Sequence, residues 1–300
     1  MKKARILLTG GNGFIGRNIA EQLNNVFNLV VPSHKKLELL NTESVEKFFK
    51  KSGNFDVVVH CAFIGGPRNS IDTAETLKNN LRIFFNIISQ KKYFGKLINL
   101  GSGAEYGKQR PLIKVSEGDF DKVIPADTDY YGFTKYIIAK YIENSDNLVN
   151  LRLFGVYGKY EDFSLRFISN ALCKSVLGMP ITINRNVFFD YLYINDFVKI
   201  LEYFLTHKTR YKSYNIGRGA PIDLVTIANK INKIANRKPS IKIKHRGFAN
   251  EYTCKNKRLT SEMNSFKFTD FDESLEELYK WYLMRVDKLR KKDFLVDHFN

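Results

Sequence analysis

The chain has 300 residues, of which 44% are hydrophobic and 14% aromatic, enough for the core of one large domain or two tightly joined ones. This composition excludes a disordered or fibrous protein, and no apolar run approaches the roughly 20 residues that span a membrane. The 48 Lys and Arg against 31 Asp and Glu give a net charge of +17, so we expect anionic partners. The 3 widely spaced cysteines exclude a disulfide framework and a CxxC metal site.

Short apolar runs alternate with longer segments of helical period, which is typical of a parallel sheet with crossover helices. The first half predicts strands at 5–8, 29–31, 56–59, 97–100 and 149–153, and helices at 13–24, 42–51, 72–92 and 129–143. After Gly158 the regular alternation of strands and helices ends. The second half predicts helices at 163–177, 195–206, 224–236 and 273–289, with short strands near Ile181 and Tyr214.

A glycine-rich turn joins the first predicted strand to the first helix. Its sequence, Thr9-Gly10-Gly11-Asn12-Gly13-Phe14-Ile15-Gly16, has the spacing GxxGxxG. Gly10 permits the tight turn, Gly13 lets the backbone approach a pyrophosphate, and Gly16 lets the helix lie close to the strand. The strand before and the amphipathic helix after are the context that dinucleotide binding requires, although a purely structural turn remains the alternative.

These features predict an α/β protein with a Rossmann doubly wound parallel sheet and a smaller mixed C-terminal substrate-binding domain. We place the dinucleotide-binding domain at 1–160, with returning segments near 187–217. The substrate-binding domain is then mostly 161–300. No Gly/Ser or Pro linker separates the two halves.

The end of the second predicted strand indicates which dinucleotide binds. A carboxylate there would hold the ribose hydroxyls of NAD, whereas a basic group would accept the 2′-phosphate of NADP. The segment contains Ser33, His34, Lys35 and Lys36 and no acid, which favours NADP(H). The alternatives are NAD(H) or one more basic patch on a basic protein.

A serine, a tyrosine and a lysine form the candidate catalytic set. Tyr131 and Lys135 lie four residues apart at the start of a predicted helix, so their side chains share one face. A cation about 4 Å from the tyrosine would lower its pKa by about 3 units and make it a proton shuttle near neutral pH. Ser102 follows a central strand and can hydrogen-bond the same substrate oxygen.

With these motifs the sequence resembles the extended short-chain dehydrogenase/reductases, the NAD(P)-dependent sugar epimerase/dehydratase family. Further similarity lies in the segments His60-Cys61-Ala62, 152–158, 190–196 and 214–217. The resemblance implies that Ser102, Tyr131 and Lys135 are catalytic. It also implies a set of residues that contact the cofactor: Gly10, Gly13, Phe14, Ile15, Gly16, Glu38, Leu39, Cys61, Ala62, Phe63, Asn80, Leu100, Tyr131 and Lys135.

Within this group, residues 37–49 and 79–88 are most similar to GDP-fucose synthase-like 4-keto-sugar reductases. Those enzymes carry an acid/base cysteine where this chain has Ala104, and a histidine near Ser164, so C3/C5 epimerisation is not expected here. Dehydratases carry an Asp-Glu pair where Gly103 and Ala104 stand, so dehydration is not expected either.

Two substitutions concern the substrate's diphosphate. The resemblance puts an asparagine at Gly155 and an arginine at Phe189, and Arg185, Arg218 or Arg246 could compensate. We therefore expect the substrate-binding residues to include Ser102, Gly103, Ala104, Arg185 and Arg218.

The leading hypothesis is NADP(H)-dependent reduction of the 4-keto group of a nucleotide-activated deoxy-hexose or heptose for surface polysaccharide synthesis. An NAD-dependent nucleotide-sugar 4-epimerase is the alternative, and a non-enzymatic dinucleotide-sensing or RNA-associated protein is a third class. Cys61 is expected to be a structural thiol. We expect a cytoplasmic homodimer that has no membrane span and binds no nucleic acid. No metal site is expected, since the five histidines form no i, i+4 metal pair.

Overall fold

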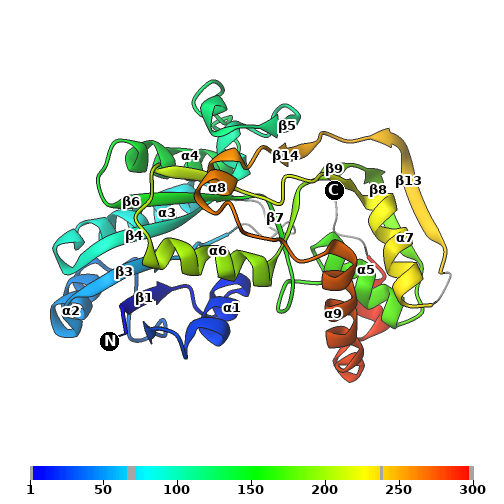
Figure 1. The fold of residues 1–300 in the computed structure, drawn as a ribbon, viewed down its shortest axis with the longest axis horizontal. Coiled ribbons are helices and arrows are strands. Elements are labelled where there is room, and N and C mark those ends of the chain that lie inside the picture. Colours follow the sequence, from blue (N-terminus) through cyan, green and yellow to red (C-terminus); the bar gives the residue numbers. More distant parts are fainter. Residues whose placement is uncertain (1–2, 66–71, 237–238, 297–300) are drawn as a thin grey trace.

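The main sheet of the protein has six parallel strands in the order β11-β6-β4-β3-β1-β2 (Figure 1). The structure, a computed structural model, describes residues 3–65, 72–236 and 239–296. In chain order the six strands are β1 (Arg5–Thr9), β2 (Asn28–Val30), β3 (Phe55–His60), β4 (Phe94–Ser102), β6 (Leu148–Leu153) and β11 (Ser213–Ile216). Because all six are parallel, their carboxyl ends meet at one edge, where open α/β sheets bind ligands.

Helices cover both faces of this sheet because successive side chains of a strand point to opposite faces. In β1, Ile6 and Leu8 enter one core cluster and Leu7 enters another. The first cluster includes α1 (Phe14–Leu23) and α6 (Ile194–Thr206), and the second includes α2 (Thr42–Ser52), α3 (Ala74–Ile88) and α4 (Tyr130–Glu143). The predicted doubly wound arrangement is confirmed.

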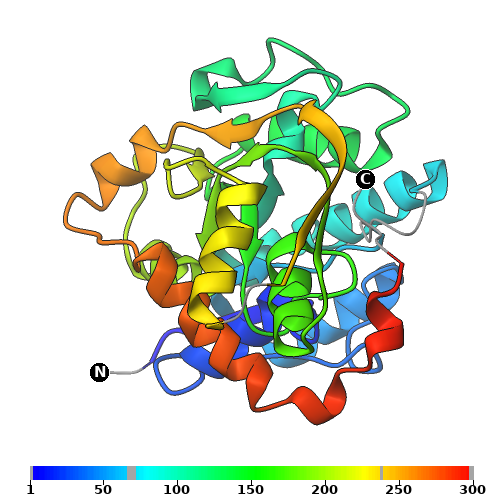
Figure 2. The same cartoon turned by 90° about the vertical axis from the view of Figure 1, so that its right-hand side faces the viewer.

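Further helices and three small sheets, built mostly from the second half of the chain, lie beside the main sheet (Figures 1 and 2). The helices are α5 (Phe167–Val176), α7 (Leu224–Ile234), α8 (Lys257–Glu262) and α9 (Phe271–Leu283). The small sheets have the orders β10-β7, β12-β9-β14-β5 and β13-β8. Their strands are β5 (Leu112–Val115), β7 (Gly155–Tyr157), β8 (Ile181–Asn186), β9 (Phe188–Phe189), β10 (Tyr191–Tyr193), β12 (Ile222–Asp223), β13 (Ile241–Phe248) and β14 (Tyr252–Cys254).

Short 3-10 turns complete the described chain. They are η1 (Lys91–Tyr93), η2 (Gly103–Tyr106), η3 (Glu117–Asp119), η4 (Val286–Lys288) and η5 (Lys291–Phe294). The turn η2 directly follows β4 and is the one that shapes the candidate site.

All the predicted strands and helices are present, with shifted ends. The helix predicted at 72–92 is shorter, because Thr73 caps its start with a capping box and η1 replaces its last turn. The helix predicted at 273–289 ends at Leu283 and is followed by η4. Sequence analysis missed the remaining strands of the small sheets, β5, β7, β9, β10, β12, β13 and β14. The side chains of β13 are almost all exposed, so no buried run marked the strand.

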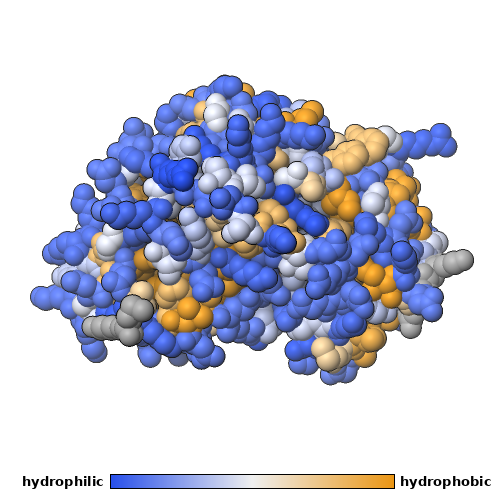
Figure 3. All heavy atoms as spheres, in the orientation of Figure 1, coloured by the Kyte–Doolittle hydropathy of each residue, from blue (hydrophilic) through white to orange (hydrophobic). Residues whose placement is uncertain are grey.

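Hydrophilic side chains dominate one face of the molecule. Figure 3 shows a face covered mainly by hydrophilic side chains, with hydrophobic atoms in small groups between them. Within residues 3–65, 72–236 and 239–296, none of the helices has the length and apolar character that a membrane crossing requires.

Phe49 of α2 provides a test of the second core cluster. Its ring is 0% exposed and packs against the rings of Phe48, Phe55, Tyr93 and Phe94. We expect Phe49→Ala to lower the free energy of unfolding by about 3–5 kcal/mol, measured by urea denaturation, because it leaves a cavity. The control Ile113→Ala removes a side chain that is 61% exposed and should change it by less than about 0.5 kcal/mol. Equal losses in both variants would refute this packing.

Candidate functional site

Close backbone contacts shape the turn between β1 and α1. Gly10 has a φ of +68°, and a Cβ there would lie 2.7 Å from the backbone nitrogen of Ala62. A Cβ at Gly16 would lie 2.2 Å from the carbonyl oxygen of Gly10, so the helix can approach the strand only with glycine at this position. Gly13 is the N-cap of α1 and supplies no side-chain cap. The first N–H groups of α1 are therefore left without a capping side chain, which suits an anion such as a pyrophosphate.

The loop after β2 carries the predicted 2′-phosphate residues. Ser33, His34 and Lys35 are all exposed. The imidazole of His34 lies 2.8 Å from the carboxylate of Glu38, which also accepts the N–H of Leu40 at 3.1 Å. Lys35 forms no ion pair within the described part of the chain, so its charge is available to an anionic ligand.

Hydrogen bonds hold the segment after β3 against the end of β1. The hydroxyl of Thr9 lies 3.0 Å from Nδ1 of His60 and accepts the N–H of Ala62 at 3.3 Å. Asn80 of α3 fixes the same segment from the other side, since its amide accepts the N–H of Ile64 at 2.8 Å and donates to the Ile64 carbonyl at 2.7 Å. Burial raises the pKa of the Cys61 thiol, which keeps the thiol protonated.

The three candidate catalytic residues come from two neighbouring elements. Ser102 is the last residue of β4 and is 7% exposed. Tyr131 lies in the first turn of α4, which Asp129 caps by accepting the N–H of Gly132 at 3.0 Å. One turn later, Nζ of Lys135 donates to the carbonyl oxygen of Leu100 in β4 at 2.7 Å.

The ring of Phe63 connects this set to the loop after β3. Its centroid lies 5.1 Å from that of Tyr131, and Nζ of Lys135 lies 4.5 Å from the Phe63 centroid. The structure therefore brings Phe63, Tyr131 and Lys135 together, with Lys135 also touching the end of β4.

The expected lowering of the Tyr131 pKa by Lys135 is wrong for this geometry. Burial is the largest influence and raises the pKa of Tyr131, although a hydrogen bond from Ser102 and the charge of Arg166 lower it. The charge of Lys135, whose Nζ lies 5.9 Å from the Tyr131 ring centroid, is not among the groups that shift this pKa. Burial also lowers the pKa of Lys135 to about 8.

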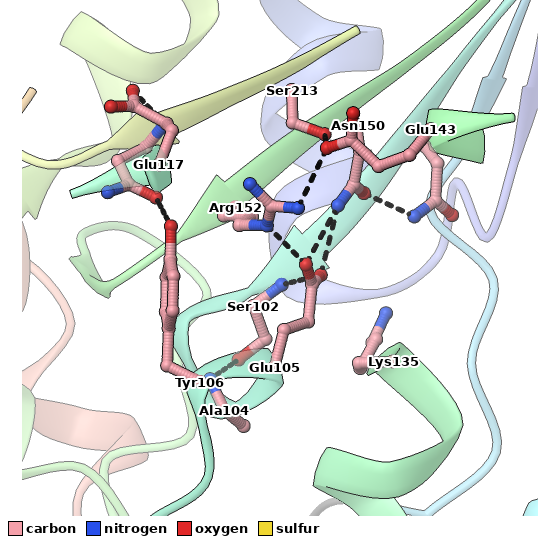
Figure 4. A network of polar contacts seen from close by, with 12 residues as sticks. Ser102, Ala104, Glu105, Tyr106, Glu117, Lys135, Glu143, Asn150, Arg152 and Ser213 are labelled. Atoms are coloured by element: carbon pink, nitrogen blue, oxygen red, sulfur yellow. Dashed lines mark hydrogen bonds and ion pairs between the residues drawn. The ribbon is translucent and has the colours of Figure 1, made fainter. Parts of the chain in front are cut away.

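A buried ion pair lies next to Ser102 (Figure 4). The carboxylate of Glu105 in η2 pairs with the guanidinium of Arg152 in β6, and both side chains are 0% exposed. The same carboxylate accepts the N–H of Ser102 at 2.9 Å and the amide of Asn150 at 2.9 Å. The turn that carries Ser102 is thereby anchored to β6.

Sequence analysis missed three parts of this site. Neither Glu105 nor Arg152 was assigned a role, because no local pattern joins residues 47 apart. Tyr252 was missed for the same reason, and its hydroxyl lies 3.4 Å from Oγ of Ser102. Arg166, the N-cap of α5, was also missed, although its charge acts on Tyr131.

The expected substrate-binding residues are spread over several elements. Gly103 and Ala104 lie in η2 and are buried. Arg185 is exposed on β8, where it pairs in register with His245 of β13. The guanidinium of Arg218 lies 5.8 Å from the ring centroid of Phe271, at the start of α9. Within the described residues, neither arginine has a contact that links it to Ser102.

Metal ligands do not gather in the described ranges: there, no group of three or more His, Cys, Asp or Glu side chains could hold an ion. Burial, together with the charge of Lys135, lowers the pKa of His60 to about 3, so this histidine is neutral at physiological pH.

Comparison with known proteins adds a family and several relatives. Residues 6–217 match the model of the NAD dependent epimerase/dehydratase family. The GDP-L-colitose synthase of Yersinia pseudotuberculosis is 24% identical over 257 residues, which cover 78% of this chain and 83% of that protein.

Solved structures show the same fold. The GDP-mannoheptose C4 reductase of Campylobacter jejuni with NADP bound superposes with a TM-score of 0.80 at 19% identity, covering 94% of this chain and 99% of the other. The UDP-glucose 4-epimerase of Thermotoga maritima with UDP-glucose gives 0.78 at 20% identity, with the same coverage of both chains. Fold similarity therefore does not distinguish a reductase from an epimerase.

Because Glu105 and Arg152 form a buried ion pair, we expect a single substitution in the pair to lower the free energy of unfolding more than the double substitution does. Glu105→Gln removes the fully buried counter-charge of the guanidinium and leaves only the more exposed carboxylate of Glu143 beside it, so we expect the free energy of unfolding to fall by about 3–5 kcal/mol. Adding Arg152→Met removes the stranded charge and should restore part of the loss, as measured by urea denaturation. An additive or larger loss in the double variant would contradict the importance of the pair.

The lowered pKa of Lys135 makes the stability of the folded protein depend on pH. Between pH 8 and 10.5 the unfolded chain holds the Lys135 proton and the folded chain does not, so this group makes stability rise with pH in that window. Below pH 8 the buried ammonium lowers the stability of the folded state by up to roughly 3 kcal/mol. The stability advantage of Lys135→Met should therefore shrink from pH 8 to 10.5 in chemical denaturation. A difference that is constant across this window would contradict the shifted pKa.

Proposed function

The chain belongs to the NAD-dependent epimerase/dehydratase family, and we propose that it uses NADPH to reduce the 4-keto group of a nucleotide-activated sugar. The observation that carries the proposal is the meeting of Ser102, Tyr131 and Lys135 at the carboxyl end of β4. That edge also holds the glycine turn after β1. A dinucleotide site and a proton-donating group can thus face one substrate.

Reduction of a ketone requires a proton donor and a hydrogen-bond donor at the oxygen that becomes the alcohol. Because burial raises its pKa, Tyr131 is protonated at neutral pH and can give its proton to that oxygen. Ser102 donates a hydrogen bond to the same atom, which stabilises the negative charge that develops there. Lys135, which lies close to the tyrosine ring, would hold the ribose of the dinucleotide.

The dinucleotide supplies the hydride when it is bound. The residues present fit this group, since a Cβ at Gly13 would meet only the Gly10 carbonyl oxygen, at 3.4 Å, and Gly13 leaves the start of α1 without a side-chain cap. Backbone groups of Gly13, Phe14 and Ile15 would hold the pyrophosphate. Exposed Ser33, His34 and Lys35 support NADP(H) over NAD(H), because they would contact the 2′-phosphate.

Several features support 4-keto reduction without epimerisation at C3 or C5. Gly103 and Ala104 are buried and carry no acid or base. The similarity to a GDP-L-colitose synthase and a GDP-mannoheptose C4 reductase supports a GDP-linked deoxy-hexose or heptose as substrate, in the synthesis of a surface polysaccharide. A 4-epimerase with tightly held NAD is the alternative.

We extend the proposal to the organisation of the protein. Residues 1–160 with the returning segments near 187–217 bind the dinucleotide, and most of 161–300 binds the substrate. The enzyme works in the cytoplasm as a homodimer. The packed helices α3 and α4 would form the dimer interface, where the ring of Phe85 is 40% exposed.

Turnover of NADPH tests this function. The purified protein should oxidise NADPH only when a GDP-4-keto-6-deoxy sugar or a GDP-4-keto-heptose is added, as followed at 340 nm. Tyr131→Phe removes the proton donor and should lower kcat by about 10²–10⁴-fold. The control Tyr130→Phe changes the adjacent tyrosine and should leave kcat within about twofold.

Another outcome would contradict the reductase proposal. If NAD co-purifies in stoichiometric amount and UDP- or GDP-hexoses are epimerised at C4 without consumption of NADPH, the protein is a 4-epimerase.

A further inference from the structure

Tyr252 comes to the candidate site from a different sheet. It lies on β14, which pairs with β5 and β9, and its carbonyl oxygen accepts the N–H of Asp190 at 3.1 Å. Its ring packs at 5.1 Å from the ring of Phe154 and at 5.9 Å from that of Phe189. These two ring contacts restrict the movement of the Tyr252 ring, which carries the hydroxyl.

The glycine at position 103 permits the approach of this hydroxyl to η2. A Cβ on Gly103 would lie 2.6 Å from the Tyr252 hydroxyl oxygen and 2.8 Å from Cε1 of Phe154. Both distances are shorter than real Cβ contacts, so any larger residue would displace the hydroxyl. Glycine at position 103 therefore leaves the space that the Tyr252 hydroxyl occupies.

The hydrogen bonds of Ser102 determine where its own proton can point. A serine hydroxyl donates one hydrogen bond and accepts two. Oγ of Ser102 caps η2 by accepting the N–H of Ala104 at 3.1 Å, and it meets the Tyr252 hydroxyl at 3.4 Å. The second distance is long for two hydroxyls, as is common in active sites before substrate binds.

Tyr252 is the donor in this pair. We assign the donor from the partners available: within the described residues, Oγ of Ser102 is the hydrogen-bond partner of the half-buried Tyr252 hydroxyl, so a proton directed elsewhere would find no acceptor among them. Burial also raises the pKa of Tyr252, which keeps the proton on it. With Oγ accepting from Ala104 and Tyr252, neither of these groups takes the Ser102 proton, which is left for a third partner at the site.

We propose that Tyr252 is a positioning residue that directs the Ser102 proton toward the C4 oxygen of the sugar. The inference rests on the proposed function, in which that oxygen lies between Ser102 and Tyr131. Tyr252 does not touch the substrate oxygen in this role. Because Tyr252 donates to Oγ of Ser102, the serine does not donate its proton to Tyr252. The Ser102 hydroxyl can then donate a hydrogen bond to the substrate oxygen without rearrangement.

Tyr252→Phe keeps the ring and removes the hydroxyl. We expect kcat for NADPH-dependent reduction to fall about tenfold with KM within about twofold, because the lost orientation affects the oxygen on which charge develops. Calorimetry should show about fivefold weaker binding of the product sugar nucleotide and unchanged binding of its 4-deoxy analogue, which lacks the oxygen.

Two further variants separate orientation from packing. Tyr106→Phe is the matched control, since Tyr106 belongs to the same buried cluster but donates to Asn215 at 2.6 Å. It should affect both ligands equally. Gly103→Ala displaces the Tyr252 hydroxyl by a different route and should reproduce the loss of kcat.

A double-variant cycle gives the closing test. In a Ser102→Ala background, Tyr252→Phe should cause no further loss of kcat, because the group that it orients is gone. A further loss equal to that in the native background, or unchanged kcat in Tyr252→Phe alone, would overturn the inference while leaving the reductase proposal intact. A native protein that reduces no 4-keto sugar nucleotide would overturn both.

Discussion

The buried pair of Glu105 and Arg152 is the constraint on which the rest of the site depends. Two fully buried charges are stable only when each is paired and hydrogen-bonded. Glu105 meets this condition by accepting from Arg152, Asn150 and the backbone of Ser102, and Arg152 also reaches Glu143 and the ring of Phe120. The turn after β4 is therefore tied to the neighbouring strand, and Ser102 has little freedom to move.

Around that anchor the chain assembles groups from two sheets. Ser102 ends a strand of the main sheet, whereas Tyr252 arrives on a strand of the four-stranded sheet, 150 residues later. Burial of this region raises the pKa of Tyr131 and lowers that of Lys135 to about 8. Burying the ammonium of Lys135 lowers the stability of the folded state. The same burial excludes water from the site and keeps the proton donor Tyr131 protonated.

Sequence alone predicted what local patterns encode. The alternation in β1, the caps of α2 and α4 and the glycine turn are short-range signals, and the helices and strands of the main sheet were found from them. Contacts between distant segments could not be predicted, so Arg152 and Tyr252 were missed. The pKa of Tyr131 was misjudged because a charge was placed about 4 Å away and the cost of burial was left out.

The central claim is that the protein transfers a hydride to a ketone carbon at C4 and a proton to the oxygen. The most direct measurement is the fate of label from NADPH deuterated at the transferred position of the nicotinamide. The account predicts one deuterium at C4 of the product sugar, and in heavy water none at C3 or C5. Product labelled at C3 or C5 in heavy water, or a C4 epimer formed without label from the dinucleotide, would contradict it.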